Sequence, residues 1–131
     1  MAVFSKDARE ITFIYNSNKN KDSETLGYIK SSEKKLNAID IAKDSLTGTQ
    51  WVALSDKLGV SLNSLIDADA IEGLPQNFDD NDTITILCEN PKALKGTIAF
   101  TANKAQLITN PSKAMDFIDP DSAGIEKQQL N

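Results

Sequence analysis

The sequence is most informative in the residue types that it lacks. Its 131 residues include no His, a single Cys (Cys88) and a single Arg (Arg9). Without His, the chain can form neither a Ser-His-Asp triad nor a Cys-His pair, and it lacks a principal zinc ligand. One Cys can form neither an internal disulfide nor a CxxC redox pair. One Arg cannot form a paired guanidinium clamp for an oxyanion. Several common catalytic designs are therefore excluded.

Basic residues and long apolar runs are also scarce. There are 19 acidic and 14 basic residues, for a net charge of −5, which is poorly suited to a nucleic-acid backbone or an anionic membrane. No apolar run reaches the roughly 18 residues of a membrane span. The first 15 residues lack the apolar stretch of a signal peptide. We therefore expect a cytoplasmic protein that binds neither nucleic acid nor membranes, and we predict no metal site and no cofactor.

The order of apolar patterns predicts one α/β domain. Strands are predicted over residues 11–15, 36–41, 97–101 and 105–109, the last two forming a hairpin. The first strand is followed by a helix capped by Asp22 or Ser23, and the next strand should lie parallel to it. Further helices are expected after the caps Thr49, Ser61, and Asn81 or Asp82, and from Pro111 to residue 118. The domain is predicted to span residues 1–118, with a helical insertion at about 49–94, and residues 119–131 form a polar tail.

Several segments resemble one family. Ile14 and Tyr15, which lead into a polar loop and a helix, resemble the start of a thioredoxin-like domain. The segment 89–100, with Pro91 and Ile98, resembles the stretch of glutaredoxin-dependent arsenate reductases that runs through Arg-Pro-Ile into a strand. That family includes the Spx transcription regulators. Residues 58–66 and 111–113 resemble its inserted helices and last helix start. The resemblance, over about residues 10–118, implies a thioredoxin-like fold with a mixed four-stranded sheet.

The residues on which this family's activity depends are replaced. The resemblance places its catalytic Cys, which follows the first strand, at Lys19 or Asn20. Its cis-proline falls at Thr97, for which we predict a trans bond. Its oxyanion-binding arginines fall near residues that are not Arg: Asp67, Lys95 or Gly96, and Thr109 or Asn110. The resemblance therefore implies the fold, and the replacements predict a degenerate active site.

Three features remain candidates for function. The loop residues Asn18, Lys19, Asn20 and Lys21 precede a helix, where they could bind an anion or a partner; a solvated loop is the alternative. Cys88 lies in an apolar run and is predicted to be a core residue rather than a redox thiol. For Trp51, at helical spacing from leucines, we favour a core position over a role at a protein interface.

The leading function is therefore a catalytically degenerate protein of the arsenate reductase and Spx type. Because Spx-like proteins bind RNA polymerase, the resemblance implies a protein partner and an interaction or regulatory role. The alternative is a thiol-dependent oxidoreductase of the arsenate reductase type that works through Cys88 or a partner's thiol. The sequence leaves the partner, the substrate and the oligomeric state open.

Overall fold

A four-stranded mixed sheet forms the centre of the protein. A computed structural model describes Phe4, Asp7 and residues 9–118. The strands are β1 (Ile11–Tyr15), β2 (Leu36–Asp40), β3 (Thr97–Phe100) and β4 (Ala105–Ile108), in the order β2-β1-β3-β4. β1 and β2 are parallel, and β3 is antiparallel to both β1 and β4. The predicted mixed four-stranded sheet, parallel first pair and closing hairpin are confirmed.

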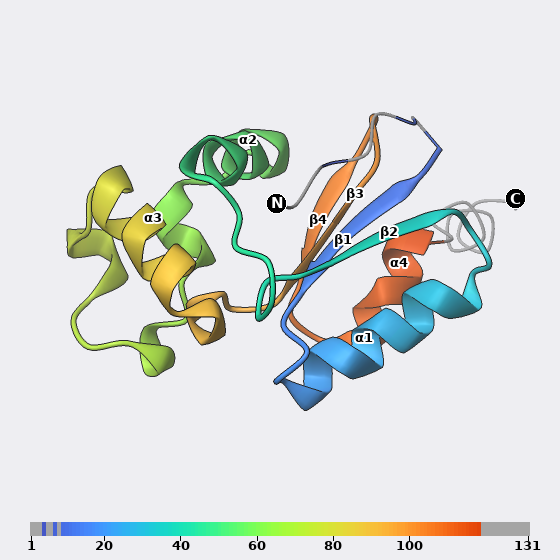
Figure 1. The fold of residues 1–131 in the computed structure, drawn as a ribbon, viewed down its shortest axis with the longest axis horizontal. Helices are drawn as coiled ribbons and strands as arrows, with labels where there is room; N and C mark the ends of the chain where they lie inside the picture. The colour runs from blue at the N-terminus through green and yellow to red at the C-terminus, as the bar shows by residue number, and fades with distance from the viewer. Residues whose placement is uncertain (1–3, 5–6, 8, 119–131) are drawn as a thin grey trace, which may run out of the picture.

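Helices lie on both sides of this sheet, as Figure 1 shows. The α-helices are α1 (Asn20–Ser31), α2 (Gly48–Leu58), α3 (Asp80–Glu89) and α4 (Ala114–Ile118). α1 and α4 cover one face, α2 lies on the opposite side, and α3 is farther from the sheet beyond α2. Five short 3-10 turns complete the described chain: η1 (Leu62–Leu65), η2 (Ala68–Ala70), η3 (Pro75–Asn77), η4 (Pro91–Ala93) and η5 (Pro111–Lys113). The predicted polar tail, residues 119–131, lies outside the described residues.

Alternation along β1 explains the two-sided arrangement. Ile11 and Phe13 belong to a core cluster with Ile29 of α1 and Phe117 of α4. Ile14 belongs to a separate cluster on the other side. Because successive strand side chains point to opposite faces, one short strand supplies both cores. The second cluster includes Trp51 and Leu54 of α2, Leu65 of η1 and Leu87 of α3.

The predicted helix starts are wrong by two to four residues. α1 begins at Asn20, so Asp22 lies in its first turn and neither Asp22 nor Ser23 caps it. Thr47, rather than Thr49, caps α2, because its side chain accepts from the Gln50 N–H at 3.1 Å while Gln50 Oε1 accepts from the Thr47 N–H at 2.9 Å. This reciprocal pair is a capping box.

The starts of the remaining helical segments also differ from the prediction. Asp79, rather than Asn81 or Asp82, caps α3 and accepts from the Asp82 N–H at 2.8 Å. Ser61 precedes a 3-10 turn and makes no side-chain cap there. The segment after Pro111 starts as the 3-10 turn η5 before α4 begins. Several nearby Ser, Thr, Asp and Asn residues could cap each helix, and only the local backbone geometry selects one of them.

Among the described residues, no helix has the length and apolar character needed to cross a membrane.

Candidate functional site

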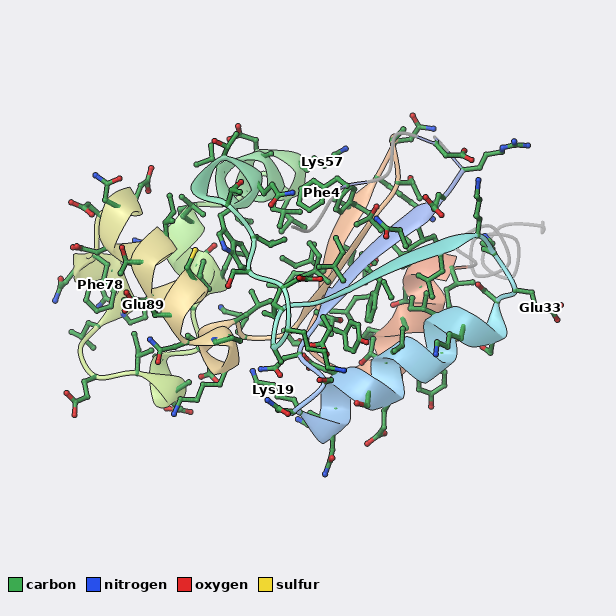
Figure 2. The ribbon with its side chains drawn as sticks, viewed as in Figure 1. Phe4, Lys19, Glu33, Lys57, Phe78 and Glu89 are labelled. Carbon is green, nitrogen blue, oxygen red and sulfur yellow. The ribbon has the colours of Figure 1, made fainter. Side chains whose placement is uncertain are left out.

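Lys19 occupies the key position between β1 and α1. It is the residue directly before the helix, with extended backbone angles, and Asn20 is the first helical residue. The Lys19 ammonium donates to the Leu94 carbonyl at 2.7 Å and so joins the loop to the segment that leads into β3. Figure 2 labels Lys19 at the start of α1. The two candidate positions for a family nucleophile therefore hold an anchored amine and an amide.

A buried polar cluster holds this loop in place. Asn16 and Asp22 are only 3% and 4% exposed. The Asn16 N–H donates to Asp22 Oδ2 at 2.9 Å, and Asn16 Oδ1 accepts from the Asn18 N–H at 2.9 Å. The Ser17 N–H donates to Asp40 Oδ1, at the end of β2, at 3.0 Å. The bond to Asp22 satisfies the buried N–H of Asn16, and the three bonds together fix the conformation of the loop.

Burial raises the pKa of Asp22, although the Asn16 N–H and the nearby Lys19 charge both act to lower it. The carboxylate points back to the loop instead of capping the helix. The sequence predicts Asp22 or Ser23 as the helix cap, because both residue types are common there, and only the fold shows that Asp22 has a different partner. Asn16 was not singled out at all, because a lone Asn after a strand is an ordinary turn residue.

Unlike α2 and α3, α1 starts without a side-chain cap in the part of the chain that the structure describes. No side chain accepts from its first N–H groups, whereas Thr47 caps α2 and Asp79 caps α3. The first turn of a helix carries a partial positive charge, which favours an anion or a water at its free donors. The start of α1 is therefore open to solvent or to a ligand.

A cavity of about 480 Å³ lies beside this start, and we call it the loop cavity. Asn16, Asn18 and Lys19 line it from the β1–α1 loop. Glu89, Asn90 and Lys92 line it from the end of α3 and from η4, and Ala42 and Pro91 complete it. The two contributing segments are about 70 residues apart in the chain. The sequence predicts a site only at the first segment, since residues 89–92 carry part of the family resemblance but no pattern that indicates a binding role.

The expected arginine positions contribute to a different cavity or are closed. Asp67 and Lys95 line a second cavity of about 530 Å³, together with Asn63, Ser64 and Gln76. At Gly96, an added Cβ would lie 2.5 Å from the Ile108 carbonyl oxygen, so no larger residue fits without a backbone shift. Asn110 caps η5 by accepting from the Ser112 N–H at 3.2 Å. The described residues therefore contain no oxyanion clamp of the expected kind.

Thr97 is part of the sheet core. It is 1% exposed, and its hydroxyl donates to the Ile108 carbonyl at 3.3 Å. None of the peptide bonds in the described segments is cis, so the bond before Thr97 is trans, as the sequence predicted.

The only Cys lies apart from the β1–α1 loop. Cys88 is on α3, is half-buried, and its thiol donates to the Leu46 carbonyl at 3.3 Å. It packs against the apolar cluster around Trp51, which agrees with the core interpretation. Trp51 itself is 1% exposed, so its core interpretation is confirmed and the interface alternative is wrong. No group of three or more potential metal ligands is found in the described part of the chain.

Solved structures resemble this chain, although comparisons of its sequence find no relative. No protein-family model matches the sequence, and no curated protein matches it either. A solved arsenate reductase from Vibrio cholerae superposes with a TM-score of 0.68 at 17% identity, covering 84% of this chain and 98% of that one. An arsenate reductase (ArsC) related protein from Brucella melitensis gives a TM-score of 0.61 at 12% identity, covering 86% of this chain and 98% of that one. At these identities the likeness establishes the fold: the chain has the thioredoxin-like fold of the structures related to arsenate reductase.

Proposed function

We propose that this protein is a non-catalytic relative of the arsenate reductases that acts by binding another protein, in an interaction or regulatory role. The observation that carries the proposal is that Lys19, and not a cysteine, occupies the position directly before α1. It stands at the helix start where a nucleophilic thiol would gain reactivity from the positive end of α1. Its ammonium is instead bonded to the Leu94 carbonyl, so the position serves to hold two chain segments together.

Two further observations support the loss of chemistry. Gly96 packs so closely on the Ile108 carbonyl that an arginine side chain is sterically excluded there. Asp67, at another expected arginine position, carries the charge that repels an oxyanion. A reductase mechanism at this site would therefore lack both its nucleophile and its anion-binding groups.

The alternative of a thiol-dependent reductase requires Cys88. Its half-buried position leaves part of the side chain accessible, but the thiol lies on α3 and is bonded to Leu46. It is absent from the residues that line the loop cavity. A Cys88 mechanism would therefore need a different site from the one at the start of α1.

A glutaredoxin-coupled arsenate reduction assay tests the proposal on the wild type and on Cys88→Ala. We expect no arsenate-dependent consumption of NADPH by either protein, because neither has a thiol at the start of α1. Activity in the wild type that disappears in Cys88→Ala would overturn the proposal and make Cys88 the nucleophile. Native thiol labelling gives the matched control: labelling of Cys88 only after denaturation supports a structural thiol.

A further inference from the structure

The loop cavity has a mixed polar lining that limits what it can bind. Carboxamides are supplied by Asn16, Asn18 and Asn90, and positive charges by Lys19 and Lys92. The one acidic side chain of the lining is Glu89. Carboxamides both donate and accept, which matches the needs of a peptide group. The volume of about 480 Å³ lies within the range of small-ligand pockets.

Asn16 brings an unused donor to this cavity. The residue is 3% exposed, and its Oδ1 is occupied by the Asn18 N–H. Among the hydrogen bonds of the described residues, the Asn16 side-chain N–H₂ makes none, and the residue lines the cavity. This nitrogen is not among the buried side-chain atoms left without a partner, so it reaches the open space of the cavity, where it is available to an acceptor oxygen of a ligand. That acceptor is independent of the open helix start beside it.

The charges favour an anion of low charge. Lys19 adjoins the uncapped start of α1 and uses one of its three N–H donors for Leu94. Lys92 is exposed at the cavity rim. Glu89 opposes a second negative charge, because like charges in one pocket repel. A single carboxylate attached to peptide groups meets all of these conditions better than a dianionic phosphate does.

We propose that the loop cavity binds the carboxyl-terminal end of another polypeptide chain. The terminal carboxylate lies toward Lys19, Lys92 and the start of α1, and the preceding peptide groups pair with the Asn side chains. Capture of a terminal carboxylate by donors of this kind is an established mode of peptide recognition. The inference rests on the proposed role as a binding protein and names the chemistry of its partner.

A titration followed by amide NMR tests this directly. The probe is N-acetyl-trialanine with a free carboxylate, compared with the same peptide ending in a carboxamide and with inorganic phosphate. We expect the free acid to shift the amides of residues 16–22 and 89–92, and the carboxamide to bind at least about tenfold more weakly, since it loses a charge-assisted bond. Equal binding of acid and carboxamide, or binding of phosphate alone, would overturn the proposal.

Charge variants with a matched control sharpen the result. Lys92→Gln should weaken binding of the free acid by about two- to fivefold, and Glu89→Gln should strengthen it by a similar factor. Lys30→Gln removes the same charge at the far end of α1 and should leave binding unchanged. An equal loss in Lys30→Gln would overturn the proposal, because it would reveal non-specific attraction. The arsenate assay is a separate readout, so a failure here is distinguishable from a failure of the proposed function.

Discussion

The start of α1 and the helical region between β2 and β3 differ in how the first N–H groups of their helices are satisfied. In the helical region, residues 47–93, Thr47 and Asp79 cap α2 and α3, and Trp51 packs in an apolar cluster. At the start of α1 the helix is uncapped, and Asn16 and Asp22 are buried beside a cavity. A side-chain cap stabilises a helix start, whereas an uncapped start costs stability and leaves its N–H groups available to a ligand. The difference is the basis on which we propose the start of α1 as the binding region.

Breaking the apolar cluster of the helical region should have the largest effect. Trp51→Ala should lower the free energy of unfolding by about 3–5 kcal/mol, because it leaves a large cavity. Trp51→Phe is the matched variant: it keeps most of the packing and removes the Trp51 Nε1 donor, which is buried without a partner. Its cost should be less than half as large. Urea unfolding followed by circular dichroism measures both costs. A cost for Trp51→Ala below about 1 kcal/mol would contradict the packing of Trp51 in the apolar cluster.

Removing a helix cap should have an effect of intermediate size on the free energy of unfolding. Thr47→Ala should cost about 1 kcal/mol, because it removes the side-chain half of the capping box. Thr49→Ala, two residues later on an exposed site, and Ser23→Ala in α1 should stay within about 0.5 kcal/mol. Thermal or urea unfolding of the three variants measures the contrast. A larger loss for Thr49→Ala than for Thr47→Ala would show that the helix starts elsewhere.

The smallest expected effect concerns pH: the Asp22 and Asp40 carboxylates should change the free energy of unfolding with opposite signs as the pH falls. Burial raises the pKa of Asp22. Burial also acts on Asp40, but hydrogen bonds from the Ser17 hydroxyl and N–H and from the Ala42 N–H outweigh it, so the pKa of Asp40 is lowered. The folded state therefore favours protonated Asp22 and ionised Asp40. Ionised Asp22 costs stability at neutral pH and this cost disappears as the pH falls, whereas the stability from Asp40 is lost below its usual pKa.

The matched variants should show this contrast in urea unfolding between pH 7 and pH 3. At pH 7, Asp22→Asn should be at least as stable as the wild type, and the difference should shrink as the pH falls. Asp40→Asn should be less stable than the wild type at pH 7, and its difference should also shrink in acid. The same sign for both variants at pH 7 would contradict the assignment of burial as the dominant cause at Asp22.

Much of the fold could be predicted because short-range patterns carry it. The β-rich run at residues 11–15, the alternation in residues 36–41 and the short hairpin turn at residues 102–104 are local features, and the four strands agree with the structure to within one residue at each end. The helix starts were less predictable, since Thr47 and Thr49 are equally good caps by residue type. Gly59 ends α2 with a φ of 70°, a conformation that glycine readily adopts.

The site was only half predictable. Lys19 was identified because it follows the first strand and precedes a helix, a place that topology makes accessible in α/β folds. Glu89, Asn90 and Lys92 could not be linked to it, because their proximity depends on how the chain returns to β3 after α3. The sequence by itself determined the element order, the mixed sheet and the missing catalytic residue types, because composition and periodicity are properties of the chain. Only the tertiary structure decided that Asp22 turns toward Asn16 and that two distant loops form one cavity, because long-range packing sets both.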